Sequence, residues 1–392
     1  MNRITLKAGK DKSVFRYHPW IFSGAIAKTE EKIQEGELVK VYNSDNLYLA
    51  TGHYQIGSIA VRILSFEDIE INYDFWRNRI AQAYKMRCNL GLTTSATNNV
   101  YRLVHGEGDD MPGLVIDYYA GVAVVQFHSV GMYLERENIA KALLEVMGDQ
   151  LTAIYDKSEG TLPYKAAIEP HNGYLYGKAE NFVALENGLK FNVDWLEGQK
   201  TGFFIDQREN RSLLEKYARG KNVLNMFCYT GGFSFYAMRG GACSVHSVDV
   251  SARAIELTKQ NVELNFPGDP RHEAFAEEAF RFLDHSQNKY DLIILDPPAF
   301  AKHQNVLNNA IQGYKKLNRK GIEVVKPGGI IFTFSCSQVM TKDLFRQTVF
   351  TAAANTGRKV KILHQLTQPA DHPINIYHPE GEYLKGLVLY VE

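Results

Sequence analysis

The chain has 392 residues, of which 45% are hydrophobic and 22% are charged, an ordinary globular composition with enough apolar material for two to three domains. Its 44 Lys and Arg residues balance its 44 Asp and Glu residues, which excludes a histone-like or acidic-tail protein but not a nucleic-acid partner on a local basic patch. Four cysteines without a C-x-x-C pair argue against a disulfide-stapled secreted protein and a cysteine zinc site. No metal site is expected.

The chain carries no convincing targeting segment. Residues 25–27 fit a small-x-small cleavage pattern, but the apolar stretch at 20–27 is interrupted and overlaps the would-be cleavage site. No apolar run approaches the roughly 18 residues that span a bilayer. We therefore expect a soluble, cytoplasmic protein without a membrane partner.

Residues 1–70 form the first predicted domain. Short stretches of β-forming residues, separated by polar and Gly-containing turns, predict strands at 4–7, 38–42, 47–53 and 59–64. Such a pattern favours a small β-barrel.

Residues 72–185 form the second predicted domain, of mixed α+β type. Apolar residues at helical spacing predict helices at 73–90 and 132–147. Strands are expected at 102–105, 114–117, 122–128 and 153–156. The stretch 158–181 has little periodicity and is predicted to be a linker or surface loop.

Residues 186–392 form the third predicted domain, of α/β class. A hairpin over 182–194, turned by Asn187 and Gly188, comes first in this region and spans the boundary at 186. Strands are expected at 223–226, 244–249, 272–275, 292–296, 329–335 and 386–391. Helices are expected between them at 206–218, 234–239, 252–264, 277–285, 309–325 and 342–355. This alternation predicts a parallel, doubly wound, Rossmann-like sheet.

Ligands of such a sheet bind outside the carboxyl ends of its strands. The first strand leads into the loop 227–233, Phe-Cys-Tyr-Thr-Gly-Gly-Phe, whose glycine pair allows close approach of a ligand before a helix begins. A plain strand-to-helix turn explains that loop equally well. The second strand ends in Asp249, which suits the two hydroxyl groups of a ribose. Asp249 is also placed to cap the next helix, a role that Ser251 fills equally well.

Together, the loop and Asp249 favour an adenosine-type ligand. Glu277 and Glu278 follow the third strand, where either one suits an adenine amine. Acidic residues that face the dipole of the next helix are at least as good an explanation for each of them.

The fourth and fifth strands end in residues with their own chemistry. Asp296 is followed by two prolines and an aromatic residue, which fix a rigid turn and suit a carboxyl group that hydrogen-bonds the edge of a planar base. Cys336 follows the next strand, so we expect its thiol in the same cleft. A lone cysteine is usually a small buried hydrophobe, but this position favours a nucleophile.

Several motifs occur in one order along the chain, and the chain resembles the family that carries them. They lie at 16–24, 104–114, 200–211, 227–233, 296–300, 335–337 and 383–387. The chain resembles the bacterial class I S-adenosylmethionine-dependent methyltransferases that carry an N-terminal PUA domain and make 5-methylcytosine in large-subunit ribosomal RNA.

The resemblance implies S-adenosylmethionine as cofactor, ribosomal RNA as partner and Cys336 as nucleophile. It implies cofactor contacts at Arg208, Phe227, Tyr229, Thr230, Asp249, Ser251, Glu278 and Asp296. Asn225, near the end of the first strand, and Gly231, in the loop that follows it, complete the predicted cofactor site. Asn225 stands where many class I methyltransferases have an acidic residue, and Glu278 where Asp is commoner.

Carbon 5 of cytosine needs activation by a thiolate that adds to carbon 6, and Asp296 is expected to bind the adduct at N3 and the exocyclic amine. The general base is not identified. A methyltransferase acting on a ring nitrogen or exocyclic amine, which needs no cysteine, is the nearest alternative. A ribosome-assembly factor with a silent methyltransferase fold is another. The oligomeric state stays open, with a homodimer among the alternatives.

RNA capture is expected at the N-terminus, where residues 1–20 hold five basic residues against one acidic residue. Basic groups interleaved with aromatic rings suit RNA. The predicted RNA-binding residues are Lys10, Lys12, Arg16, His18 and Trp20. A place in the barrel core is an equally good explanation for Trp20.

Overall fold

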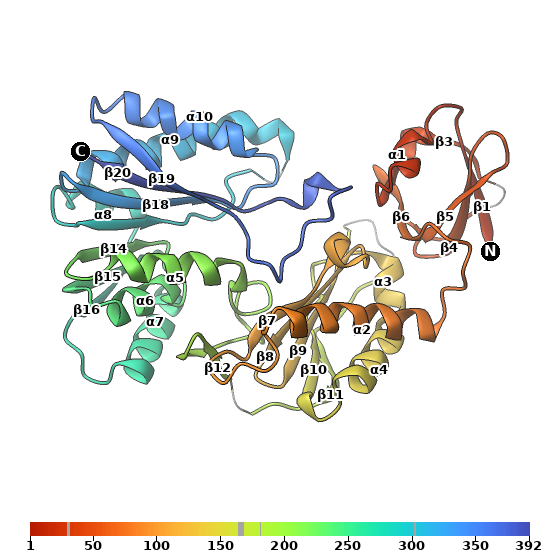
Figure 1. The fold of residues 1–392 in the computed structure, drawn as a ribbon, viewed down its shortest axis with the longest axis horizontal. Coiled ribbons are helices and arrows are strands. Elements are labelled where there is room, and N and C mark those ends of the chain that lie inside the picture. The colour runs from red at the N-terminus through yellow and green to blue at the C-terminus, as the bar shows by residue number, and fades with distance from the viewer. Residues whose placement is uncertain (30–31, 164–167, 181, 302) are drawn as a thin grey trace. The chain divides into compact units, whose positions relative to one another are not determined.

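The computed structural model describes residues 1–392 except 30–31, 164–167, 181 and 302. The chain divides into two compact units, each built from separate stretches of sequence (Figure 1). The N-terminal unit comprises Met1–Leu185, Val193–Ile205 and Ala370–Gly381, and the C-terminal unit comprises Glu186–Asn192, Asp206–Pro369 and Glu382–Glu392.

The N-terminal unit begins with a six-stranded sheet of order β2-β6-β5-β4-β1-β3. Its strands are β1 (Asn2–Leu6), β2 (Trp20–Phe22), β3 (Ile26–Thr29), β4 (Leu38–Tyr42), β5 (Tyr48–Tyr54) and β6 (Ile59–Ser65), with the short helix α1 (Lys12–Phe15) between β1 and β2. Alternating inward residues such as Ile4, Val39 and Val41 form its core. Four of these strands were predicted; β2 and β3 were not.

The rest of this unit contains a five-stranded sheet of order β11-β10-β9-β8-β7. Its strands are β7 (Val100–His105), β8 (Leu114–Tyr119), β9 (Val122–Phe127), β10 (Ala153–Asp156) and β11 (Gly173–Gly177), and its helices are α2 (Tyr73–Asn89), α3 (Val130–Leu134) and α4 (Arg136–Met147). Asn72 caps α2 by accepting a hydrogen bond from the Phe75 N–H. The prediction of a linker or loop over 158–181 is wrong in part, since β11 pairs antiparallel with β10.

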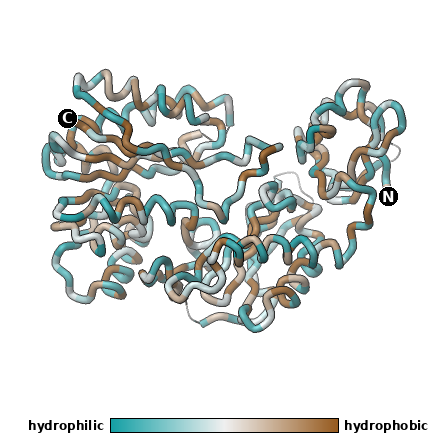
Figure 2. Tube along the Cα trace, in the orientation of Figure 1, coloured by the Kyte–Doolittle hydropathy of each residue, from teal (hydrophilic) through white to brown (hydrophobic). Residues whose placement is uncertain are grey.

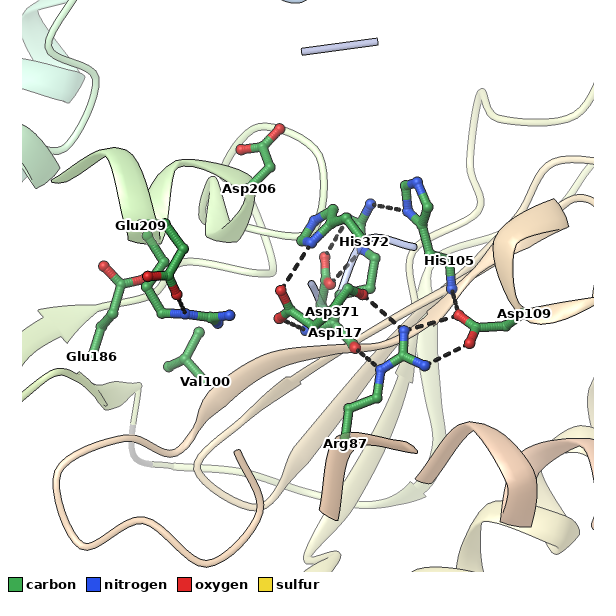
Figure 3. A network of polar contacts seen from close by, with 12 residues as sticks. Arg87, Val100, His105, Asp109, Asp117, Glu186, Asp206, Glu209, Asp371 and His372 are labelled. Carbon is green, nitrogen blue, oxygen red and sulfur yellow. Dashed lines mark hydrogen bonds and ion pairs between the residues drawn. The ribbon is translucent and has the colours of Figure 1, made fainter. Parts of the chain in front are cut away.

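Arg87 of α2 fastens the distant segment Ala370–Gly381 within the N-terminal unit (Figure 3). Its guanidinium group binds the Asp109 carboxylate with both Nη atoms, at 2.5 and 2.9 Å, and the Asp371 carbonyl at 2.8 Å. The Arg102 N–H donates to the Asp371 carboxylate at 3.0 Å. Arg87 is fully buried, so this pairing satisfies a charge that water does not reach.

The C-terminal unit contains a seven-stranded sheet of order β16-β15-β14-β17-β18-β20-β19. Its strands are β14 (Asn222–Met226), β15 (Ser244–Asp249), β16 (His272–Ala276), β17 (Leu292–Leu295), β18 (Gly329–Ser335), β19 (Val360–Leu366) and β20 (Lys385–Val391). Strands β14 to β18 are parallel, and β20 runs antiparallel to both of its neighbours. The predicted doubly wound sheet is confirmed, with β19 as an additional strand.

Helices cover both faces of this sheet (Figure 1). They are α5 (Arg208–Tyr217), α6 (Gly232–Arg239), α7 (Ala252–Asn265), α8 (Ala279–Asp284), α9 (Leu307–Val324) and α10 (Lys342–Ala354). The strands β12 (Val183–Glu186) and β13 (Leu189–Asn192) flank the predicted turn, where Asn187 and Gly188 both have positive φ, at 49° and 82°. Figure 2 shows hydrophobic residues along the inner strands, of which β17 and β18 are buried throughout. Among the described residues, none of the helices combines the length and apolar character of a membrane span.

Candidate active site

The predicted site residues of the C-terminal unit follow the carboxyl ends of neighbouring parallel strands. Asp296 comes directly after β17, and Cys336 directly after β18. These two strands are paired in parallel, with Leu295 opposite Thr333, so both residues leave the sheet at the same edge. Asp249 ends β15 at that edge too, and β14 lies between β15 and β17 in the sheet. Ligands of doubly wound sheets bind at this edge.

The loop after β14 has a backbone shape that hydrogen bonds fix: the Cys228 N–H donates to the Val248 carbonyl at 3.0 Å, and the Gly231 N–H donates to the Cys228 carbonyl at 2.8 Å. Phe227, Tyr229 and Gly231 have φ values of 58°, 49° and 88°, in the left-handed region. A side chain at Gly231 would lie 2.6 Å from the Phe235 ring, so only glycine fits there. Thr258 of α7 holds the loop by donating to the Tyr229 carbonyl at 2.9 Å. The loop is therefore a preformed cradle before the N-terminus of α6.

Asp249 ties this loop to the start of α7. One carboxylate oxygen accepts from the Tyr229 N–H at 3.1 Å, and the other accepts from the Ser251 N–H at 2.9 Å. The Ser251 hydroxyl caps α7 by accepting from the Ala254 N–H. A carboxylate has about four acceptor sites, so Asp249 retains capacity for ribose hydroxyl groups.

Asn225 supplies an unsatisfied acceptor beneath the loop. It is 1% exposed, and its Nδ2 donates to the Ser234 hydroxyl at 2.9 Å. Its Oδ1 is buried and has no hydrogen-bond partner among the described residues. A buried orphan acceptor fits a ligand that carries an N–H donor, such as an amino-acid ammonium group.

The remaining predicted cofactor residues have mixed surroundings. Arg208 and Thr230 are buried, at 3% exposure each, and Arg208 begins α5. The Thr230 carbonyl accepts from Asn261 of α7. Glu278 is exposed, and its carboxylate caps α8 by accepting from the Arg281 N–H at 2.9 Å. This is the local role that the sequence left open for Glu278, and its adenine contact stays a prediction.

Asp296 is half-buried and is held by a residue that the sequence analysis did not single out. Gln207 donates from Nε2 to the Asp296 carboxylate at 3.1 Å. Burial and, to a smaller extent, the negative charge of Asp206 raise the pKa of Asp296 to about 7, against the opposite effects of the Gln207 hydrogen bond and the Arg211 charge. With a pKa in this range, the carboxyl group is partly protonated near neutral pH, and such perturbed groups are common at functional sites.

Cys336 is half-buried beside the Asp296 turn. The hydroxyl of the next residue, Ser337, donates to the Ala301 carbonyl at 2.5 Å, which ties the segment after β18 to the segment after β17. Burial raises the pKa of Tyr314 to about 12, and the charges of Cys336 and Asp296 act in the same direction. The structure thus brings together the two residues for which the sequence predicted catalysis.

Sequence reasoning missed Gln207, Tyr314 and Lys385 as members of this site. Lys385 belongs to it because its Nζ donates to the carbonyl of Ser337, the residue after Cys336, at 2.7 Å. Gln207 lies within the motif at 200–211 and Lys385 within the motif at 383–387, so only their motif membership pointed to them. Tyr314 lies in the middle of α9, where its position resembles any core aromatic residue.

The predicted RNA-binding residues divide into two groups in the N-terminal unit. Lys10, Lys12 and Arg16 are exposed around α1, and none of the three forms an ion pair with a described residue. His18 and Trp20 are half-buried instead: His18 Nε2 lies 3.5 Å from the Glu380 carboxylate, and the Trp20 indole donates to Glu107 at 2.8 Å. The basic group around α1 is thus exposed on the surface of this unit, and its contact with RNA stays a prediction.

Comparison with known proteins agrees with this geometry. Residues 101–379 match the family of S-adenosylmethionine-dependent methyltransferases, and residues 4–66 match the PUA-like domain family. The protein named ribosomal RNA large subunit methyltransferase I of Pseudoalteromonas atlantica is 41% identical, covering 100% of this chain and 99% of its own length. Its namesake from Vibrio vulnificus is 40% identical, with 99% of both chains covered.

Solved structures also resemble the whole chain. A candidate methyltransferase complexed with SAH has 26% sequence identity and a TM-score of 0.86, with both chains fully covered. A candidate S-adenosylmethionine-dependent methyltransferase from Streptococcus mutans has 25% identity and the same TM-score. The chain belongs to the S-adenosylmethionine-dependent methyltransferase family and carries a PUA-like domain at its N-terminus.

Proposed function

We propose that this protein methylates carbon 5 of a cytosine in large-subunit ribosomal RNA through a covalent adduct with Cys336. The coarser part, a ribosomal RNA substrate, is supported by the names of relatives about 40% identical over the full chain. The finer part rests on one observation: a thiol follows β18 beside the Asp296 carboxyl group that follows β17. Methylation of a nitrogen atom has no use for that thiol.

S-adenosylmethionine supplies an electrophilic methyl group when it is bound. The residues that fit it are the cradle after β14, Asp249 for the ribose hydroxyl groups and the Asn225 oxygen for the ammonium group. Each offers the chemical partner that one part of the cofactor requires.

The chain's own residues activate the base. The Cys336 thiolate forms a bond to carbon 6, which opens the carbon 5–carbon 6 double bond and makes carbon 5 nucleophilic. Asp296, in its protonated form, donates a hydrogen bond to N3 and stabilises the electron pair that the addition pushes into the ring. Loss of the carbon 5 proton and departure of the Cys336 sulfur restore the double bond after methylation.

RNA capture is assigned to the basic group around α1. Lys10, Lys12 and Arg16 are exposed there, together with the aromatic rings of Phe15 and Tyr17, which are 54% and 52% exposed. Cations that contact phosphate and rings that stack on bases are the usual elements of RNA recognition.

The test uses RNA that carries 5-fluorocytosine, because fluorine on carbon 5 cannot leave as a proton and traps the thioether. Wild-type protein with S-adenosylmethionine should form an adduct that survives denaturing electrophoresis. Cys336→Ala should form none and should lose methyl transfer by at least about 10³-fold. Calorimetry should show unchanged cofactor binding in the variant.

Cys243→Ala is the matched control, because Cys243 is exposed and lies at the amino end of β15, away from the site edge. It should behave as wild type in both assays. Methyl transfer by Cys336→Ala at the wild-type rate would contradict the adduct and favour a nitrogen-methylating enzyme. Wild-type protein that binds cofactor and RNA without transferring a methyl group would instead favour a silent assembly factor.

A further inference from the structure

Lys385 places a buried ammonium group alongside Cys336. The residue is 3% exposed, and it opens β20 directly opposite Ser335, the last residue of β18. Its Nζ donates to the Ser337 carbonyl at 2.7 Å and to the Tyr383 carbonyl at 2.8 Å. Because the side chain starts opposite residue 335 and ends at the carbonyl of residue 337, it runs along the residue between them.

No carboxylate among the described residues forms an ion pair with this ammonium group, whose two acceptors are neutral carbonyl groups. Glu382, three residues away, pairs with Lys342 instead. A buried cation is stable only when an anion or several dipoles compensate its charge. Two groups can place a negative charge near Lys385, and because Glu382 already pairs with Lys342, the other one, the Cys336 thiol, is the candidate partner.

The electrostatics of the pair agree with this assignment. Burial and, to a smaller extent, the positive charge of Lys342 lower the pKa of Lys385 to about 8, while negative charge on Cys336 and on Glu382 acts in the opposite direction. The interaction between two titrating groups is mutual. If the thiolate favours the protonated lysine, the protonated lysine favours the thiolate to the same extent.

Cys228 shows what a thiol does in the same unit without such a cation. It is 6% exposed in the loop after β14, and burial raises its pKa far above the ordinary value for a thiol, with the charge of Asp249 acting in the same direction. A thiol of that kind is inert. Cys336 differs from Cys228 in two respects: it is only half-buried, and the Lys385 side chain runs beside it.

Gly386 allows the lysine to sit this deep. A side chain at that position would lie 2.6 Å from the Phe334 ring and 3.0 Å from the Leu366 Cβ. The missing side chain lets β20 approach its neighbours closely at the point where Lys385 begins. A glycine directly after Lys385 thus explains how the lysine can be buried at the start of β20.

We propose that Lys385 is a positioning residue for the nucleophile, and that its ammonium group holds Cys336 as a thiolate before RNA binds. This inference rests on the proposed function of Cys336. The thiol proton moves from Sγ to the neutral Nζ, which leaves a thiolate and an ammonium group and consumes no other reactant. The thiolate is then ready to bond to carbon 6 of the base.

The test measures the thiol rather than methylation. Full-length protein without RNA is treated with iodoacetamide at a series of pH values, and alkylation of the peptide that contains Cys336 is followed by mass spectrometry. In the wild type, the midpoint should lie below about pH 7.5. Lys385→Met should raise it by at least about one pH unit, which slows alkylation about tenfold at pH 7.

Two further variants separate charge from structure. Lys385→Arg keeps the positive charge and should bring the midpoint back toward that of the wild type. Lys359→Met removes an exposed cation next to Val360, which pairs with Val391 at the other end of β20, and it should leave the midpoint unchanged. A wild-type midpoint in Lys385→Met that still binds S-adenosylmethionine would overturn the proposal.

A second measurement, on protein that keeps Lys385, tests the proposal even if Lys385→Met does not fold. Thiolate absorbance near 240 nm, taken as wild type minus Cys336→Ala over the same pH range, gives the Cys336 titration directly. A midpoint at or above about 8.5, the value of an unperturbed thiol, would overturn the proposal.

The two proposals fail in different ways. A shifted alkylation midpoint in Lys385→Met together with full methyl transfer by Cys336→Ala would support the ammonium–thiolate pair and overturn the adduct mechanism. A trapped 5-fluorocytosine adduct together with an unmoved midpoint would support the adduct and overturn the role of Lys385.

Discussion

Asp296 is a carboxyl group whose surroundings favour its neutral form. Its raised pKa, about 7 against an ordinary 3.8, means that the folded protein binds this proton more tightly than the unfolded chain does. The free energy of unfolding therefore falls as the pH rises from about 4 to about 7, and it falls no further above that range. The buried carboxyl group thus lowers the stability of the fold at neutral pH. The same burial gives Asp296 a pKa at which it can gain or lose a proton near pH 7.

Asp296→Asn removes the titration and keeps the size of the side chain. Relative to the wild type, the variant should be more stable at pH 8 than at pH 5, with the difference between the two pH values about 1–3 kcal/mol, at about 1.4 kcal/mol per pKa unit and discounted for partial solvation. Urea unfolding at both pH values measures this. Asp343→Asn, an exposed carboxylate on α10, is the control and should show no such difference. Equal behaviour of the two variants would contradict the raised pKa.

Asp249, Asp296 and Cys336 could be predicted from the sequence because each directly follows or ends a buried strand. In a parallel sheet, the order of strands alone brings their carboxyl ends to one edge. Lys385 could not be found in this way. Its place beside Cys336 depends on the antiparallel register of β20 on β18, which pairs residues 50 positions apart, Ser335 with Lys385. No local pattern encodes that register.

At the scale of elements, the strands that the sequence analysis missed share one property. They are β2, β3, β11 and β19, and each lies at an edge of its sheet. An edge strand packs against only one neighbour, so it needs fewer buried residues and shows weaker alternation. In β19, for example, Ile362 and Leu363 are exposed at 45% and 42%. The inner strands, which position the site, carry the strong apolar pattern and were predicted.

The short helix α1 allows a direct test of RNA capture. Lys10, Lys12 and Arg16 lie in or beside it and are exposed. Replacing all three by Gln should lower affinity for large-subunit ribosomal RNA by at least about tenfold at low salt. The slope of log affinity against log salt should fall by roughly 0.7–1 for each phosphate that the variant no longer neutralises. Fluorescence polarisation over a salt series measures both quantities.

The control for this test removes the same charge elsewhere. Lys85, Lys216 and Lys259 are exposed and lie on three different helices, so their joint replacement by Gln keeps the net charge equal to that of the first variant. Equal loss of affinity in both triple variants would mean that total charge, and not the basic group at α1, determines RNA binding.

At the scale of the whole molecule, neither unit is a continuous piece of chain. The segments Val193–Ile205 and Ala370–Gly381 belong to the N-terminal unit although their sequence neighbours belong to the other. The second segment leaves the seven-stranded sheet between β19 and β20 and is fastened by Arg87 and Arg102. The sequence analysis placed each domain boundary at one position, which assumes that each domain is one continuous stretch of chain. Local sequence patterns do not show that a later segment, such as Ala370–Gly381, packs back into the N-terminal unit.

Arg87 should therefore carry more of the molecule's stability than any surface arginine of the same helix. Arg87→Met leaves Asp109, 4% exposed, as a buried carboxylate without its partner, and it frees the carbonyls of Arg102 and Asp371. We expect the free energy of unfolding of the full chain to fall by about 3–5 kcal/mol in urea titration. Arg77→Met, on the same helix, breaks a half-exposed pair with Glu145 and should lower it by less than about 1 kcal/mol. Similar losses of unfolding free energy in the two variants would mean that the buried Arg87–Asp109 pair does not hold the segment Ala370–Gly381 in place. A much larger loss in Arg87→Met would identify Arg87 as the residue that fastens this segment to the N-terminal unit.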